Sequence, residues 1–248
     1  MTKLSRAVVA YISAVIMSAG VASIAGADTF TYELNGSLAE SNGGPSLVSY
    51  GGTLSSSGYF FGINQGLSLS GTGAFDVYSI DIHFYFDDVS ATHYQRILDF
   101  KNRTSDSGLY DSGGALQLFA SSGSGDPSAV SAGQVFTNGT MADLLVTRDA
   151  SGHFSAYVNG NLAFSVMDTD GSTRFSGPDN IIYFFMDDFV SLTNFPDQPE
   201  AGTGLVDFIQ VTTPAASVPG PIAGAGLPGL IFASVGLLGW CRRRQKIA

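Results

Sequence analysis

Closely spaced aspartates are the residues in this sequence with the clearest capacity for chemistry. Asp87-Asp88 and Asp187-Asp188 each follow an aromatic-rich stretch, and Asp168 to Gly171 offers further closely spaced oxygens. Adjacent carboxylates repel each other unless a cation or water neutralises them, and Ca²⁺ takes several oxygen ligands. The four paired aspartates are therefore candidate calcium ligands, with Asp187 and Asp188 placed first. Acidic turns in contact with water are the alternative.

Catalytic constellations are missing from the sequence. Glycoside hydrolysis needs two carboxylates that flank the scissile bond, and metal or nucleophilic chemistry needs histidines at defined spacings. The chain has three glutamates and three separated histidines, namely Glu33, Glu40, Glu200, His83, His93 and His153. No glutamate has an aspartate two residues later, and no Gly-x-Ser-x-Gly elbow occurs. The sequence assigns no catalytic residue and predicts a protein that is not an enzyme and requires no cofactor.

Charge is distributed unevenly along the chain. All 21 acidic residues lie between Asp28 and Asp207, where only five basic residues occur, so this stretch carries a net charge of −16. A surface of that sign repels phosphate backbones, which excludes nucleic acid as a partner. The only cysteine, Cys241, lies near the C-terminus. The acidic stretch must therefore be held by its core, without an internal disulfide.

The N-terminus has the three parts of an export signal. Lys3 and Arg6 precede an apolar run that ends in Ala25-Gly26-Ala27. A positive start, an apolar middle and a small-x-small site predict a signal peptide over residues 1–27, cleaved between Ala27 and Asp28. The expected partners are a Sec-type export machinery and signal peptidase, and the chain is expected to cross the inner membrane.

The C-terminus has the composition of a membrane span. Residues 212–221 form a linker with prolines, which separate it from the domain because proline cannot extend a strand. Residues 222–240 are nineteen positions without a charge, close to the ~20 residues that cross a bilayer as a helix. Arg242, Arg243 and Arg244 follow, and the positive-inside rule keeps them cytoplasmic. The domain would then lie outside.

This tail resembles the PEP-CTERM sorting signal of Gram-negative exporters over about the last thirty residues. The resemblance rests on the motif Val218-Pro219-Gly220-Pro221, the glycine-rich apolar span and the arginine cluster. Gly220 stands where the family has glutamate, so the tail resembles a glutamate-less variant. The resemblance implies recognition by an exosortase, a membrane-embedded protease or transpeptidase. Residues 222–248 would then anchor the chain only transiently, before it reaches the outer surface or the extracellular space.

Residues 28–211, between the two ends, have the pattern of short β-strands separated by Gly, Ser, Asn and Asp turns. Ten stretches alternate or are rich in aromatic residues: Thr29 to Leu34, Tyr59 to Ile63, Val77 to Phe86, Ile97 to Phe100, Leu116 to Ala120, Leu144 to Arg148, Phe154 to Val158, Leu162 to Val166, Ile181 to Met186 and Val206 to Val211. Such strands must bury one face against a second sheet, which predicts an antiparallel β-sandwich. The predicted fold class is therefore all-β, flanked by an N-terminal signal helix and a C-terminal transmembrane helix.

The strongest local pattern is a hairpin, because Asn159-Gly160 separates two of these stretches. Asn-Gly favours a type I′ turn, in which both central residues take positive φ. Together with residues 82–88, 96–100, 184–188 and 204–209, this hairpin resembles laminin-G-like and concanavalin A-like sandwiches, over about 130 residues. The resemblance implies a jelly-roll sandwich. Members mostly bind glycans or proteins, some with calcium, and a minority are glycosidases.

Three functions stay open at this point. The favoured one is an exported glycan-binding or adhesive module, processed by an exosortase-type system, with a polysaccharide as its ligand. The second is a structural envelope protein without a ligand. The third is a glycoside-active enzyme, which is disfavoured because related sandwich glucanases use a Glu-x-Asp-x-x-Glu strand that this chain lacks. In the favoured case Tyr94 and Tyr110, exposed near acidic loops, could stack on sugar rings.

Overall fold

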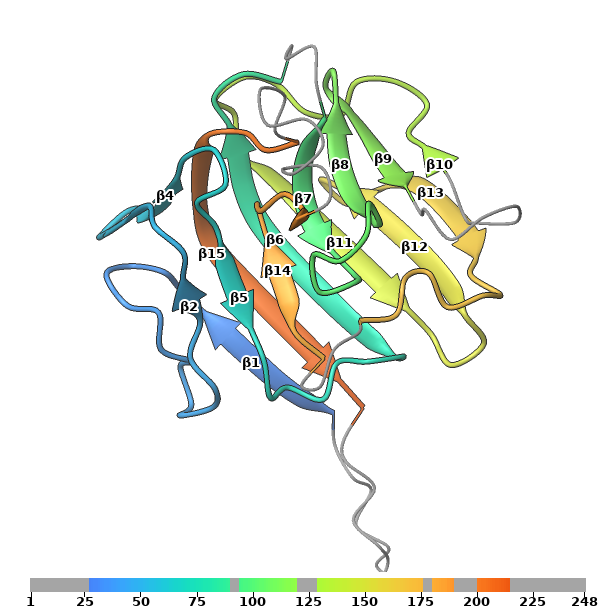
Figure 1. Ribbon diagram of the computed structural model, residues 1–248, viewed down its shortest axis with the longest axis horizontal. Helices are drawn as coiled ribbons and strands as arrows, with labels where there is room; N and C mark the ends of the chain where they lie inside the picture. Colours follow the sequence, from blue (N-terminus) through green and yellow to red (C-terminus); the bar gives the residue numbers. More distant parts are fainter. Residues whose placement is uncertain (1–26, 90–93, 120–128, 176–179, 190–199, 215–248) are drawn as a thin grey trace, which may run out of the picture. The chain divides into compact units, whose positions relative to one another are not determined.

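The computed structural model describes residues 27–89, 94–119, 129–175, 180–189 and 200–214 (Figure 1). These residues belong to one compact unit, Ala27–Pro214, and form two antiparallel β-sheets. The predicted all-β sandwich is confirmed. The linker beyond Pro214, the predicted helices and the sorting motif lie outside the described residues, apart from Ala27 at the signal cleavage site. Within the described part of the chain, no helix is long and apolar enough to span a bilayer.

The larger sheet, sheet A, contains eight strands. Its order is β13 (Asn161–Met167), β12 (His153–Val158), β11 (Ala142–Arg148), β6 (Tyr78–Phe86), β15 (Gly204–Thr213), β4 (Gly58–Phe61) and β3 (Thr53–Ser55). The eighth strand, β1 (Asp28–Tyr32), pairs with β15 from Asp28 opposite Thr213 to Tyr32 opposite Ile209. The predicted first residue of the mature protein is thus the first residue of a strand.

The second sheet, sheet B, contains seven strands. Its order is β10 (Ala129–Val130), β9 (Ala115–Phe119), β8 (Gly108–Ser112), β7 (Gln95–Asp99), β14 (Ile182–Phe184), β5 (Leu67–Leu69) and β2 (Val48–Ser49). Every pairing in both sheets is antiparallel. Sheet A joins β11 to β6, β6 to β15 and β15 to β4, so the centre of this sheet pairs strands that are distant in the sequence.

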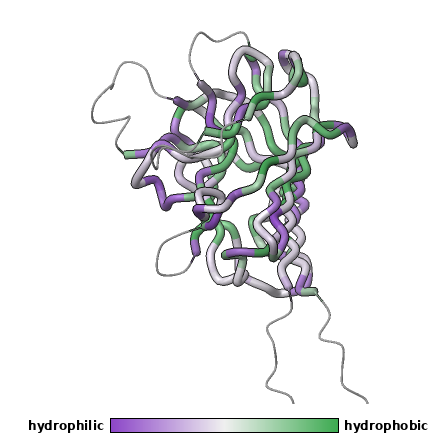
Figure 2. Tube along the Cα trace, turned by 90° about the vertical axis from the view of Figure 1, so that its right-hand side faces the viewer, coloured by the Kyte–Doolittle hydropathy of each residue, from purple (hydrophilic) through white to green (hydrophobic). Residues whose placement is uncertain are grey.

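Strict alternation along β6 shows why this sequence forms a two-layer sandwich. From Tyr78 to Phe86 every second residue is buried, and the residues between them, such as Asp81 and His83, are half-buried. Side chains of a strand point alternately to its two faces, so one face enters the core and the other faces outward. Figure 2 shows hydrophobic stretches running through the middle of the molecule.

Aromatic rings fill the space between the sheets. Phe61 stacks on Phe185 with ring centroids 4.1 Å apart, and Phe84 and Phe86 pack nearby with their centroids 5.4 Å apart. Fully burying one such side chain contributes about 1.5–3 kcal/mol. This aromatic core holds the two sheets together, and no cysteine lies among the described residues.

The hairpin prediction is confirmed, and the ends of other predicted strands are corrected. Asn159 and Gly160 both take positive φ, 50° and 74°, as a type I′ turn requires. The strand predicted over 29–34 ends at Tyr32, and the one over 59–63 ends at Phe61. The predicted strand 181–186 ends at Phe184, because Phe185 adopts a φ of 61° and turns the chain. The strand predicted to end at Phe100 stops at Asp99. Five strands were not predicted: β2, β3, β5, β8 and β10.

Gly204 provides a test of the packing in sheet A. It pairs with Phe61 on one side and Phe86 on the other, and an added Cβ would clash with the Tyr85 carbonyl oxygen and lie 2.9 Å from Phe61 Cζ. We expect Gly204→Ala to lower the free energy of unfolding by about 1–3 kcal/mol, measured by urea denaturation. Gly133→Ala is the control, because nothing lies within 4 Å of its added Cβ. Equal stability of the two variants would contradict this packing.

Candidate functional site

A β-bulge in sheet B brings two charged residues of β7 together. The pairing of β7 with β8 shifts by one residue between Arg96 and Leu98. An extra residue in a strand interrupts the alternation of faces. Arg96 and Asp99 therefore contact each other although they are three residues apart, with Nη1 and Oδ2 separated by 2.6 Å. Both side chains are fully buried.

Among the described residues, five carboxylates surround the guanidinium of Arg96, and we call this group the Arg96 cluster. The carboxylates within 4.0 Å of its guanidinium nitrogens are Asp99 (2.6 Å), Asp188 (2.6 Å), Asp106 (3.1 Å), Glu200 (3.4 Å) and Asp187 (3.7 Å). The Tyr110 ring lies against the same guanidinium, with its centroid 4.8 Å from Cζ. Burying this many charges is costly unless each has a partner.

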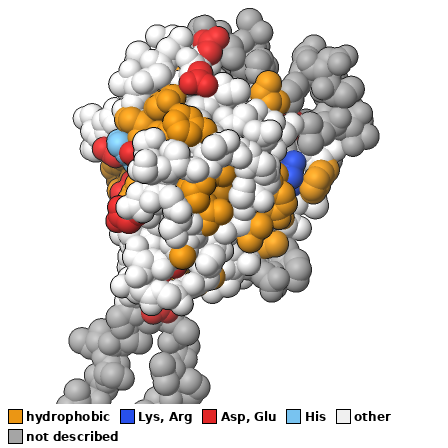
Figure 3. Space-filling view, turned by 90° about the vertical axis from the view of Figure 1, so that its left-hand side faces the viewer, with side chains coloured by type: hydrophobic (Ala, Val, Ile, Leu, Met, Phe, Trp, Pro, Cys, Tyr) orange, Lys and Arg blue, Asp and Glu red, His pale blue; other side chains and the backbone are white. Residues whose placement is uncertain are grey.

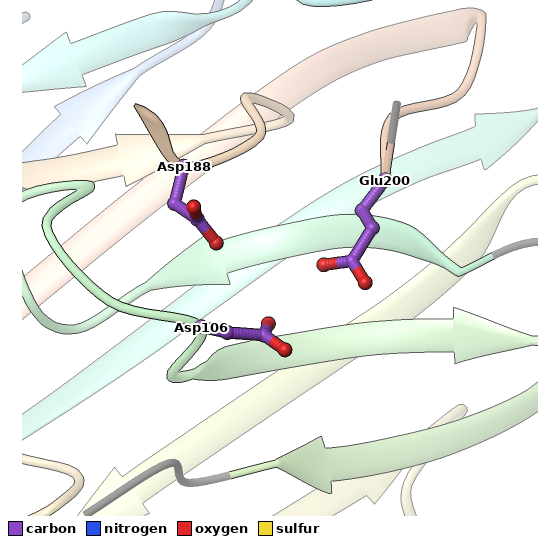
Figure 4. Close-up of side chains that lie close together, drawn as sticks. All are labelled: Asp106, Asp188 and Glu200. Atoms are coloured by element: carbon purple, nitrogen blue, oxygen red, sulfur yellow. The ribbon is translucent and has the colours of Figure 1, made fainter. Parts of the chain in front are cut away.

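Three members of this cluster have the arrangement of a metal site. Asp106, Asp188 and Glu200 come from separate segments, and each offers one oxygen within 4.8 Å of the other two (Figure 4). Arg96 Nη2 contacts all three of these carboxylates. The guanidinium thus occupies the position that a cation between them would take. The geometry favours Arg96 as their counter-ion, and calcium binding here stays a prediction.

Burial dominates the titration of the cluster. It raises the pKa of Asp99 and of Asp187, although Arg96 pulls both in the opposite direction. Burial, with repulsion from Asp106, raises the pKa of Glu200 to about 7. Asp99, Asp187 and Glu200 therefore hold protons at a higher pH than exposed carboxylates do.

The four paired aspartates lie in two different environments. Asp187 and Asp188 are fully buried and contact Arg96, which corrects the expectation of acidic turns in water. Asp87 and Asp88 are exposed; Asp87 accepts a hydrogen bond from Thr203. The Asp88 backbone carbonyl accepts one from the Gln95 side chain, next to Arg96. The two pairs thus contact adjacent residues of β7, Gln95 and Arg96.

The other acidic loop has a structural role. Asp168 is buried and accepts hydrogen bonds from the backbone N–H groups of Ser172 and Thr173 and from Nε of Arg148, at 2.9 Å for the last. A carboxylate that accepts several such bonds fixes the conformation of its loop. This loop is held by the fold itself, so the oxygens of Asp168 already have protein partners.

A second candidate site is an open cavity on the outer side of sheet A, which we call the β15 cavity. Its volume is about 310 Å³, and it is lined by Glu33, Asn35, Ser56, Ser57, His83, Asp207 and Phe208. The His83 ring makes a hydrogen bond of 2.6 Å from Nδ1 to Asp207 Oδ1. The lining combines carboxylate, amide and hydroxyl groups with one aromatic ring, which is the mixture found in sites for polar small molecules.

The exposed aromatic residues lie elsewhere. Tyr94 is exposed as expected, but Tyr110 is 1% exposed and packs on Arg96, so the prediction of an exposed Tyr110 was wrong. Tyr50 and Tyr183 lie with centroids 6.0 Å apart, and Arg103 lies over Phe189. Figure 3 shows hydrophobic side chains gathered on the side of the sandwich where β2 and β4 lie.

Sequence reasoning missed the residues that organise both sites. The predicted strand begins at Ile97, and Arg96 enters only as part of the stretch 96–100 that carries the family resemblance. A lone arginine beside apolar residues and followed by Asp99 indicates a buried ion pair. His83 was treated as an isolated histidine, whereas it contacts Asp207, which lies 124 residues away. The sequence contains no local signal for that contact.

Comparison with protein families matches residues 61–184 to the model described as the concanavalin A-like lectin/glucanases superfamily. A comparison with curated proteins gave no match. Among solved structures, domain 4 of AbnA, an extracellular GH43 arabinanase from Geobacillus stearothermophilus in complex with arabinotriose, is 18% identical with a TM-score of 0.53. That match covers 77% of this chain and 95% of the other.

Two further structures extend the likeness. Botulinum neurotoxin type C, whose cell entry depends on two ganglioside molecules, is 14% identical with a TM-score of 0.56, covering 77% of this chain and 49% of the toxin chain. Trypanosoma rangeli sialidase in complex with a difluorosialic acid is 12% identical with a TM-score of 0.53, covering 74% and 29%. At these identities the likeness establishes the fold, which hydrolases and binding domains share.

The raised pKa values of Glu200 and Asp111 predict that the stability of the fold depends on pH. Burial also raises the pKa of Asp111 to about 7, as in Glu200, whereas unfolded carboxyls titrate near ~4. The folded state thus binds more protons between about pH 4.5 and 7, so its stability falls as pH rises through that window. We expect the melting temperature to be higher at pH 5 than at pH 8.

Glu200→Gln, which resembles the protonated side chain, should reduce this difference. Glu33→Gln is the control, because Glu33 is exposed and lies outside the Arg96 cluster. Scanning calorimetry at a series of pH values makes the measurement. A melting temperature that rises from pH 5 to pH 8 would contradict the raised pKa values of Glu200 and Asp111.

Proposed function

The chain belongs to the concanavalin A-like lectin/glucanases superfamily, and on that premise we propose that it is an exported cell-surface or extracellular-matrix protein that binds glycans. The observation that carries the proposal is the β15 cavity, an open site on a lectin-type sandwich whose lining suits hydroxyl groups. Sugar-binding sites combine directed hydrogen bonds with an aromatic surface. Both elements are present in this cavity.

The binding partners of similar folds agree with this proposal. The arabinanase domain was solved with arabinotriose, and the neurotoxin interacts with gangliosides. These ligands are those of the other proteins, and they suggest carbohydrate as the class to test. The charge of the domain disfavours anionic glycans, because its net charge of −16 over residues 28–207 repels them.

We propose a binding role without catalysis, because two of the three glutamates have structural tasks. Glu40 accepts hydrogen bonds from the backbone N–H groups of Thr31, Asn42 and Gly44, which hold its loop. Glu200 belongs to the Arg96 cluster. A glycosidase needs a carboxyl pair on opposite sides of the scissile bond. Glu33 and Asp207 are the two carboxylates that line the β15 cavity, and Asp207 is already hydrogen-bonded to His83 Nδ1.

The proposed route to the surface rests on the two ends of the sequence. The export signal over residues 1–27 would place the domain outside the inner membrane. The tail from Val218 to Ala248 would be recognised by an exosortase-like protease, which releases or transfers the chain. The proline motif around Gly220 lies a few residues beyond Pro214, the last described residue. A cut there would leave the sandwich whole.

Glycan binding is tested directly with the full chain on arrays of immobilised neutral, acidic and amino polysaccharides. We expect retention on at least one neutral polysaccharide, with no release of reducing sugar. Retention should persist in EDTA, because Arg96 already neutralises the carboxylates that could hold calcium. Loss of binding in EDTA would contradict that role of Arg96. Absence of binding in every condition would instead favour a structural envelope protein.

Mass spectrometry of the protein recovered from its producing cells tests export and sorting. We expect a mature N-terminus at Asp28 and a C-terminus upstream of Ile222. The mature chain would then lack the arginines at 242–244, because a sorting protease cuts before the apolar span. A protein that retains the segment from Arg242 to Ala248 would contradict cleavage and make that segment a permanent anchor.

A further inference from the structure

The β15 cavity lies where strand β15 changes its neighbour. One edge of β15 pairs with β4 from Gly204 to Val206 and with β1 from Ile209 to Thr213. Asp207 and Phe208 are the two residues between these pairings, opposite neither strand. The sheet therefore opens at this point on one side of β15, and the chain following β1 and the β3–β4 turn form the walls of the opening.

A bulge on the other edge of β15 turns two consecutive side chains outward. The pairing with β6 shifts between Val206 and Phe208, so that Phe208 lies opposite His83. Asp207 and Phe208 are both half-buried, whereas a regular strand would send one of them into the core. Bulges next to functional sites re-aim side chains in this way. Here the bulge brings a carboxylate and a ring into the same cavity.

Two unusual backbone conformations support the walls of the cavity. Leu34 has a φ of 49° although it is not glycine, and its side chain is buried while its neighbours Glu33 and Asn35 line the cavity. Gly58 has a φ of 131°, and an added Cβ would lie 2.7 Å from the Val206 carbonyl oxygen. Unfavourable conformations of this kind persist where the surrounding structure enforces them, and they occur often at ligand sites.

A hydrogen bond to Asp207 fixes the His83 ring in the lining of the cavity. Nδ1 lies 2.6 Å from Asp207 Oδ1, so Nδ1–H donates to this carboxylate. Nε2 lies 3.8 Å from Asp143 Oδ1, which is beyond a hydrogen bond. Because Nδ1 is held by Asp207, Nε2 of the neutral ring can accept a hydrogen bond from a hydroxyl group. In this cavity the carboxylate positions the histidine.

The charges around the cavity select the class of ligand. Glu33 and Asp207 line it, and no lysine or arginine does. Asp81 and Asp143 lie next to His83 on the same sheet, and burial together with Asp143 raises the pKa of Asp81. Uronates, sulfates and phosphates would meet like charges here, whereas hydroxyl groups can donate to the carboxylates. Among the described residues of the lining, no lysine or arginine is available to compensate an anion.

Building on the proposed glycan-binding function, we propose that the β15 cavity is a subsite for one neutral sugar ring. The ring's hydroxyl groups bind Asp207, Glu33 and the His83 imidazole, and its apolar face packs on Phe208. A cavity of about 310 Å³ is at the lower end of small-molecule sites, which suits one ring rather than several. Neighbouring rings of a polysaccharide would extend along the outer side of sheet A.

The first test monitors the histidine rings of the full chain by NMR. The chain has only three histidines, at 83, 93 and 153, and the variants His83→Gln and His153→Gln assign their signals. Arabinotriose, cellotriose and maltotriose are the neutral probes, and trimers of galacturonic acid and of glucosamine are the charged ones. We expect a neutral trimer to shift the His83 signal and to leave His153, which is exposed on β12, unchanged.

The second test measures affinity for the same trimers by calorimetry. Asp207→Asn keeps the shape of the side chain but removes the charged acceptor, and we expect binding of the neutral trimer to weaken by about tenfold or more. Phe208→Ala should weaken it as well. The controls are His153→Gln and Leu162→Ala, which alter exposed residues outside the cavity. Circular dichroism confirms that each variant is folded.

The outcomes separate this inference from the function on which it rests. If the chain binds no glycan, the proposed function fails, and the subsite fails with it. If a neutral glycan binds but the His83 signal stays in place and Asp207→Asn binds equally well, the function stands and the subsite is wrong. Preferential binding of the galacturonic acid or glucosamine trimer would overturn the ligand class.

Discussion

The burial of two arginines, one near each end of the sandwich, is the constraint on which its loops depend. Arg96 contacts carboxylates from three places in the chain: the segment after β7, the segment after β14 and the segment before β15. Arg148 is paired with Tyr78 at the start of β6 and contacts Asp76, Asp168 and Thr173. Removing one partner of a buried ion pair costs about 3–5 kcal/mol, because the other charge stays buried. The described segments contain no cysteine, and the ion pairs of these two arginines hold their loops together in place of disulfides.

This constraint gives the acidic Arg96 cluster a counter-ion from the protein itself, while calcium binding there stays a prediction. The carboxylates of the Arg96 cluster are turned toward one guanidinium, which is also held against Tyr110. Nearby charges raise the pKa of Arg96 despite its burial, so it stays charged. The excess of acid is taken up by protons and by backbone donors, such as the N–H groups of Lys101 and Arg103 that bind Asp99.

The sequence was sufficient where structure follows from local pattern. Alternation predicted β6, and Asn159-Gly160 predicted the hairpin, because turn geometry and side-chain periodicity depend on neighbouring residues. It was insufficient where a bulge shifts the register. Arg96 and Asp207 each lie at a pairing irregularity, and such irregularities arise from packing across sheets rather than from composition. The two sites could not be assembled from spacing, because their partners are brought together by strands far apart in the chain.

The position of the cavity along β15 fits a protein that is attached or released at its ends. Asp28 pairs with Thr213, so both connections to the rest of the chain leave the sandwich at one end. The Arg96 cluster lies beyond the opposite end of β6, where it orders loops. Asp207 and Phe208 lie between the two, on the outer side of a sheet. The site consists of residues of the sandwich alone, so the glycan recognition proposed for it uses no residue of the tail.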